Sequence, residues 1–232
     1  MKISRWSALL GALGLILLLV GASMGLFLAP AEQHMGDVSR ILYVHVPTAW
    51  NGLLVYLFAF VFALLSLWHD RERWDGPLTG AVETGVVLNV VLLLTGMFFA
   101  RPTWGVWWDW DVRLTTSLVS LFLFAGVLAL RSFLDDAEQR ATWSAVATII
   151  AFVDVPLIYF CVRWWRSLHQ IQSSPDTVDS AMVLPLRINA FAILFLAIWM
   201  ITVRSQIEKA RLAGEQVPEP KRLAPLVEGA VH

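Results

Sequence analysis

The sequence predicts an all-α, polytopic membrane protein with six transmembrane helices, and two observations carry this prediction. Hydrophobic residues occupy 58% of the 232 positions and charged residues only 15%, a composition typical of a chain embedded in lipid. Six apolar stretches also approach the roughly 20 residues that a helix needs to cross a bilayer. These stretches are 7–29, 44–68, 78–100, 117–134, 142–162 and 186–203.

The first apolar stretch is expected to be an uncleaved helix whose N-terminus lies in the cytoplasm. Lys2 and Arg5 precede it, as in a signal peptide, but its apolar core exceeds the roughly 7–15 residues of such a peptide. In this orientation 11 of the 17 lysines and arginines lie inside and the other six outside, as the positive-inside rule favours. Six spans then return the C-terminus to the cytoplasm.

Two regions are predicted along the chain. Residues 1–204 are expected to form one membrane domain of six helices, and the sequence shows no internal repeat. Residues 205–232 carry mixed charge and the sequence Pro218-Glu219-Pro220, which indicates a partly disordered cytoplasmic tail.

The composition also excludes several functions. The net charge of −1 offers no basic surface for nucleic acid. The single cysteine, Cys161, excludes an internal disulfide, a thiolate metal cluster and a CxxCH haem-attachment motif. The chain has no GxxxxGK[ST] motif, so it does not itself hydrolyse a nucleotide through a P-loop.

The most distinctive segment is 104–116, which follows the third apolar stretch and reads WGVWWDWDVRLTT. It contains Trp104, Trp107, Trp108, Trp110, Asp109 and Asp111. An interfacial aromatic belt explains single tryptophans elsewhere in the chain, but it does not need four indoles and two acids in one loop. Two nearby acids are also costly in a packed core. We therefore expect an aromatic shelf for a large planar ligand that carries charge.

Two histidines are expected to lie on the same side of the membrane as this segment. His45 begins the string HVPTAW at the start of the second stretch, and His169 ends the string RWWRSLH after the fifth. The loops after spans one, three and five share a side whatever the orientation. Two neutral imidazoles beside indole rings suit the axial ligands of haem iron, although either histidine alone also fits a structural role. His34, in the first outer loop, is a weaker alternative ligand.

Other polar residues supply further expectations. Four arginines on the same side are candidates to hold the two haem propionates in fork geometry: Arg101, Arg113, Arg163 and Arg166. Asp109 and Asp111 are expected to orient Arg113, a histidine NH or an indole NH.

Four charged residues lie within or at the ends of the spans. Glu83 and Asp154 are ionisable groups at membrane depth that either mark a site or pack with a partner such as Asn89. Arg131 and Arg187, at span ends, are expected to extend toward the lipid headgroups.

These motifs together resemble those of the heme exporter protein C family. Its members are haem-handling subunits of system I cytochrome c maturation and carry a tryptophan-rich segment called the WWD domain. Segment 104–116 fits the signature WGxxWxWDxRLT, and the strings at His45 and at Trp164 to Gln170 resemble the two flanking histidine motifs. The resemblance covers nearly the whole chain except the C-terminal tail. Trp107 and Asp109 occupy variable positions of the signature, so Trp107 is a candidate through aromatic clustering alone.

The resemblance implies a function and a set of partners. His45 and His169 would bind the iron of haem b from opposite faces, with Trp104, Trp107, Trp108, Trp110 and Asp111 in the haem-holding segment. Haem, as the transported ligand, would be presented at the periplasmic face of the bacterial inner membrane to a periplasmic haem chaperone. An ABC ATPase subunit, a second permease subunit and a small single-span subunit would complete the complex, so this chain would not itself be an enzyme.

Three alternatives remain open from the sequence. A cytochrome c haem lyase of the same tryptophan-rich group is generally larger and carries histidines inside the membrane. A b-type electron-transfer subunit typically has histidines facing each other in mid-span, whereas this chain has none in the middle of an apolar stretch. A permease for another solute leaves the clustered tryptophans and histidines unexplained.

Overall fold

The computed structural model describes residues 4–169, 178 and 180–215, and all regular structure in these residues is helical apart from one isolated bridge. Six helical segments are long and apolar enough to cross a membrane, which confirms the predicted fold class. The elements, in chain order, are α1 (Arg5–Ser23), η1 (Met24–Leu28), η2 (Asp37–Ile41), α2 (Leu42–Trp68), α3 (Arg71–Trp104), α4 (Val112–Ser132), α5 (Ala137–Phe152), α6 (Asp154–Trp164) and α7 (Ser180–Glu215).

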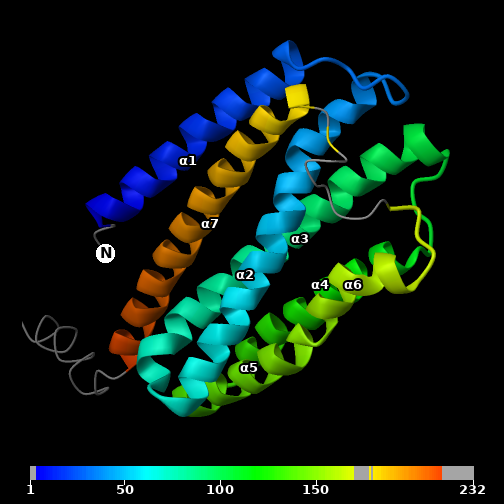
Figure 1. Cartoon of the computed structure of the whole chain (residues 1–232). Coiled ribbons are helices and arrows are strands. Elements are labelled where there is room, and N and C mark those ends of the chain that lie inside the picture. Colours follow the sequence, from blue (N-terminus) through cyan, green and yellow to red (C-terminus); the bar gives the residue numbers. More distant parts are fainter. Residues whose placement is uncertain (1–3, 170–177, 179, 216–232) are drawn as a thin grey trace, which may run out of the picture.

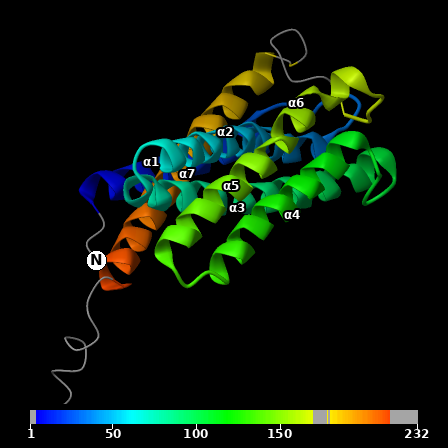
Figure 2. The ribbon, with the colours of Figure 1, turned by 90° about the horizontal axis from the view of Figure 1, so that it is seen from below.

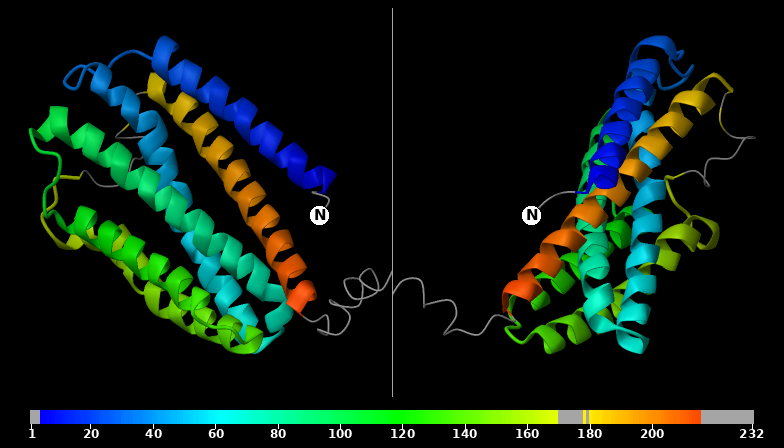
Figure 3. Two further views of the ribbon diagram at one scale, coloured as in Figure 1. Left: turned by 180° about the vertical axis from the view of Figure 1, so that it is seen from behind. Right: turned by 90° about the vertical axis from the view of Figure 1, so that its left-hand side faces the viewer.

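The helices pack side by side in a bundle (Figure 1). Helix α1 packs along α7, and both lie on one side of the central pair α2 and α3. On the other side α4 runs beside α5 and α6 (Figure 2). We name the end that carries segment 104–116 the outer end, and the opposite end the inner end. Helices α3 and α4 approach each other at the inner end and diverge toward the outer end (Figure 3).

Side-chain caps set where three of these helices begin. The carboxylates of Asp70, Asp111 and Asp136 accept hydrogen bonds from backbone NH groups in the first turns of α3, α4 and α5, which satisfies donors that no helical carbonyl can reach. Helix α3 ends at Gly105, which adopts the left-handed conformation with φ of 81°. The helix therefore includes Trp104, four residues beyond the predicted span.

The fifth predicted span is one transmembrane segment built from two helices. Helix α5 ends at Phe152 and α6 begins at Asp154, with Val153 donating to the carbonyl of Ile150 at 3.2 Å. Pro156 has no NH to donate to the carbonyl of Phe152, so the regular helical hydrogen bonding is interrupted here.

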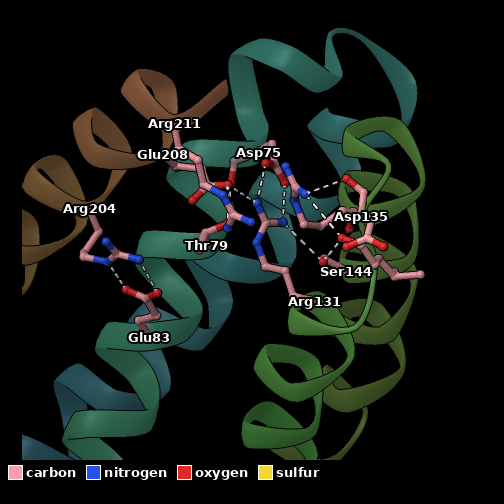
Figure 4. Close-up of polar contacts among 11 residues, drawn as sticks. Asp75, Thr79, Glu83, Arg131, Asp135, Ser144, Arg204, Glu208 and Arg211 are labelled. Atoms are coloured by element: carbon pink, nitrogen blue, oxygen red, sulfur yellow. Dashed lines mark hydrogen bonds and ion pairs between the residues drawn. The ribbon is translucent and has the colours of Figure 1, made fainter. Parts of the chain in front are cut away.

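The inner end is held by a buried ionic network (Figure 4). The guanidinium of Arg131 binds both carboxylate oxygens of Asp75 at 2.6 Å and the carboxylate of Glu208 at 2.7 Å, and it also donates to Ser144 at 3.3 Å. All four side chains are buried. The expectation that Arg131 extends toward headgroups was therefore wrong, because carboxylates from α3 and α7 satisfy its charge inside the bundle.

A second ion pair also links α3 to α7, and it answers one question left open by the sequence. The carboxylate of Glu83 binds the guanidinium of Arg204 with two hydrogen bonds, so Glu83 acts as a packing partner in the bundle (Figure 4). Helix α7 continues from there to Glu215. The first eleven residues of the predicted tail are thus helical, and residues 216–232 lie outside the described residues.

Candidate functional site

A cavity of about 570 Å³ lies at the outer end between α2, α3, α4 and α6. His45 and His169, which are 124 positions apart in the chain, both line it. Its walls also include Trp104, Trp108 and Arg113. The volume falls within the range of roughly 300–1,000 Å³ that is usual for small-molecule and cofactor sites.

His45 lies in the second turn of α2, and α3 holds its ring in place. Its Nδ1 atom is 3.0 Å from the hydroxyl oxygen of Thr95. The neighbouring Gly96 leaves the space that the ring occupies, since a Cβ atom at this position would lie 3.2 Å from Cε1 of His45. Helix α2 begins at Leu42, two residues before the predicted span, and Pro47 lies inside it.

His169 lies in the loop after α6, against segment 104–116. Its ring makes an edge contact with Trp104, with ring centroids 5.4 Å apart. Its Nδ1 atom lies 3.3 Å from a carboxylate oxygen of Asp111 but makes no well-aligned hydrogen bond within the described residues. Burial is the main cause that lowers the pKa of His169 below 6.5, with Arg113 adding to the effect and Asp111 opposing it. The imidazole is thus kept neutral, the form that binds a metal.

Asp111 connects α4 to the loop that carries His169. One carboxylate oxygen accepts from the backbone NH of Arg113 at 2.9 Å, and the other accepts from the NH of Leu168 at 2.8 Å. Burial alone would raise the pKa of Asp111, but hydrogen bonds from Ser167, Leu168 and Arg113 outweigh burial and lower it. The charged carboxylate therefore fixes the His169 loop against the start of α4.

The four tryptophans of segment 104–116 do not face the same way. Trp104 and Trp108 line the cavity, and the indole NH of Trp108 is buried with no partner among the described residues. Trp107 is 51% exposed and makes an edge contact with Phe98, and Trp110 is 76% exposed. Neither of these two lines the cavity, so only half of the predicted shelf faces it.

Only one of the four candidate propionate ligands lines the cavity. Arg113 does so, and its Nε atom is buried with no partner in the described part of the chain. Arg101 instead donates to the carbonyl of Gly105, and Arg163 lies over the ring of Tyr159 at 5.9 Å. Arg166 is exposed.

The deep end of the cavity contains polar residues that the sequence reasoning missed or assigned differently. Tyr56 and Asn89 line it, with the Asn89 amide donating to the Tyr56 hydroxyl at 3.3 Å and to the carbonyl of Ser117 at 3.1 Å. These bonds join Asn89 to Tyr56 and Ser117, and not to Glu83 or Asp154. Polar side chains within apolar spans were the available signal.

The fold and the cavity define a class: a polytopic membrane protein in which two imidazoles and two indole rings line one cavity at the outer end of the bundle. The model of the family "Heme exporter protein C" matches residues 2–217. The chain belongs to this family.

Relatives match over most of their own length. Heme exporter protein C of Haemophilus influenzae is 35% identical over 208 residues, which cover 88% of this chain and 85% of the relative. That of Bradyrhizobium diazoefficiens is 31% identical over 221 residues, covering 93% and 84%. A ccmC-like mitochondrial protein of Arabidopsis thaliana, whose name assigns it to cytochrome c biosynthesis, is 30% identical over 214 residues, covering 87% and 81%.

Proposed function

We propose that this protein binds haem b in the outer cavity and delivers it to a periplasmic haem chaperone for c-type cytochrome biogenesis. The observation that carries the proposal is that His45 and His169, from distant parts of the chain, line the same cavity. Neutral imidazoles are common axial ligands of haem iron. Family membership supports haem as the ligand.

The other cavity residues fit the remaining parts of a haem. The buried indole NH of Trp108 and the Nε atom of Arg113 lack partners within the described residues, and such donors are costly to leave unpaired. Two carboxylate-bearing propionates would satisfy them. Trp104 would pack against the porphyrin, while Asp111 would hold the His169 loop in position.

The exposed tryptophans Trp107 and Trp110 have a different role in this proposal. They lie outside the cavity on the same loop, where they would form the rim and anchor the loop at the membrane surface, as interfacial tryptophans do.

The proposed assembly follows from the same family membership. The protein would act in the bacterial inner membrane as a subunit of an ABC-type complex with an ATPase, a second permease subunit and a small single-span subunit. Since the chain has no P-loop motif, the ATPase partner would supply the energy. The protein itself would bind and release haem without making or breaking covalent bonds.

Purified variants after haem-replete expression test this function. His45→Ala and His169→Ala should each reduce the Soret absorbance per folded protein at least tenfold, because each removes one axial ligand. His34→Ala and His69→Ala are matched controls outside the cavity and should retain the wild-type spectrum. Absence of a Soret band in the wild type, or its retention in both ligand variants, contradicts the proposal.

The same preparation separates the proposed function from its alternatives. The purified protein should transfer haem to a periplasmic chaperone but form no thioether bond when mixed only with haem and apocytochrome. Thioether formation would identify a haem lyase. Rapid stoichiometric haem reduction by quinol would identify an electron-transfer subunit.

A further inference from the structure

We infer that Thr95 is a positioning residue: it fixes His45 as the tautomer that carries its proton on Nδ1 and presents an unprotonated Nε2 to the cavity. The inference rests on the proposed function only in its use of haem as the ligand. The tautomer itself follows from contacts between α2 and α3.

The hydrogen bonds of Thr95 determine which atom donates. Its hydroxyl oxygen lies 2.8 Å from the carbonyl of Val91 and 3.0 Å from that of Leu92, in addition to 3.0 Å from Nδ1 of His45. A hydroxyl has one proton. If Thr95 gave this proton to His45, its lone pairs would face two carbonyl oxygens at hydrogen-bonding distance, which is repulsive.

The alternative arrangement avoids this repulsion. Thr95 donates its proton to the carbonyls of its own helix, as threonines in helices commonly do. Its oxygen then accepts the proton on Nδ1 of His45. In a neutral imidazole with a protonated Nδ1, Nε2 carries the lone pair that binds a metal.

Gly96 leaves room for the His45 ring against α3. A Cβ atom at Gly96 would lie 3.2 Å from Cε1 and 3.8 Å from Nδ1 of His45, so glycine lets the ring lie against α3. The two neighbouring residues therefore have separate roles: Thr95 sets the tautomer and Gly96 admits the ring. Pre-positioned second-sphere contacts of this kind typically change metal affinity about 10–100-fold when they are removed.

The tautomer can be measured without haem. Solid-state NMR of full-length, ¹⁵N-histidine-labelled protein in lipid bilayers at pH 8 should show a protonated Nδ1 and an unprotonated Nε2 for His45, assigned by comparison with His45→Gln. Thr95→Val keeps the shape but removes the acceptor, so the His45 signals should shift toward a mixture of tautomers. Thr95→Ser should restore the wild-type pattern.

Haem titration of the same proteins connects the tautomer to binding. Thr95→Val should bind haem about 10–100-fold more weakly, with part of the bound haem high-spin, and Thr95→Ser should bind like the wild type. Thr84→Val is a matched control, because Thr84 lies on α3 and donates to the carbonyl of Gly80 but does not line the cavity. Gly96→Ala should weaken binding while leaving the tautomer unchanged.

The outcomes separate this inference from the proposed function. If Thr95→Val keeps the wild-type His45 signals, or if its haem affinity and spin state equal those of the wild type, Thr95 does not position His45. If His45→Ala keeps full haem affinity while the wild type shows the expected tautomer, the proposed function fails and the tautomer assignment stands.

Discussion

The buried guanidinium of Arg131 at the inner end and two buried donors beside the cavity at the outer end differ in how they are paired. At the inner end Arg131 is fully engaged by Asp75, Glu208 and Ser144, all buried. At the outer end, donors of Trp108 and Arg113 are buried without a partner among the described residues. Helices α3 and α4 approach each other at the inner end and diverge toward the outer end (Figure 3). The network lies at the inner end and the cavity at the outer end.

This difference indicates that the two ends of the bundle have separate roles. Satisfied charges inside a bundle strengthen the links between helices but leave nothing to bind a ligand. Unsatisfied donors cost folding free energy and persist where a ligand repays that cost on binding. The inner end should therefore determine the stability of the protein, and the outer end its ligand affinity.

The largest expected effect is on stability. Arg131→Met should lower the free energy of unfolding by about 3–5 kcal/mol, because it leaves two carboxylates buried without their cation. Denaturant unfolding in detergent micelles would measure it. Haem bound per folded molecule should not change, since Arg131 is far along α4 from the cavity residue Arg113.

An exposed ion pair at the same end provides the matched control. Arg71 binds Glu138, with the two side chains 41% and 75% exposed. Arg71→Met should therefore lower stability by less than about 1 kcal/mol. Equal losses for the Arg71 and Arg131 variants, or a haem affinity that falls with Arg131→Met, would remove the proposed division between the two ends.

A smaller effect is expected from removing the buried indole NH of Trp108, which has no partner among the described residues. Trp108→Phe keeps an aromatic ring in the cavity wall but removes the indole NH. If that NH binds a propionate, haem affinity should fall about tenfold, the equivalent of roughly 1.4 kcal/mol for a hydrogen bond to a charged group. Equilibrium titration against a haem-binding competitor would measure the change.

Trp107→Phe is the control for this comparison, because Trp107 is on the same loop but outside the cavity. It should leave haem affinity within about twofold of the wild type, since it removes no donor from the cavity wall. A larger loss for Trp107→Phe than for Trp108→Phe would mean that the ligand lies on the exposed side of the loop.

The sequence predicted the spans and the common face of His45 and His169 because both depend on local pattern and on counting membrane crossings. The facing of individual tryptophans was not predictable in this way. Gly105, in its left-handed conformation, ends α3 directly after Trp104. The indoles that follow are directed by the loop and not by a helical repeat.

The inner network was missed for a related reason. Arg131 lies 56 residues from Asp75 and 77 from Glu208 along the chain, so no local pattern links them. An arginine at the end of an apolar stretch is usually a headgroup-facing residue. Thr95 was overlooked because a lone threonine is common in a membrane helix, and its contact with His45 exists only once α2 and α3 pack.

The smallest expected effect is the response of haem binding to mild acid. A proton and the iron compete for the same lone pair of His169, so affinity is full while the ring is neutral and is lost as the pH falls through its pKa. Burial, with help from Arg113, lowers that pKa below 6.5. Haem affinity should then change less than about twofold between pH 7.5 and 6.5 and fall steeply only below that range.

Asp111→Asn keeps a capping oxygen but removes the charge that raises the pKa of His169, so it should move the loss of haem affinity to still lower pH. Spectroscopic titrations of the two proteins would measure the midpoints. A wild-type midpoint above 6.5, or an upward shift in Asp111→Asn, would show that burial of His169 does not protect it from protonation.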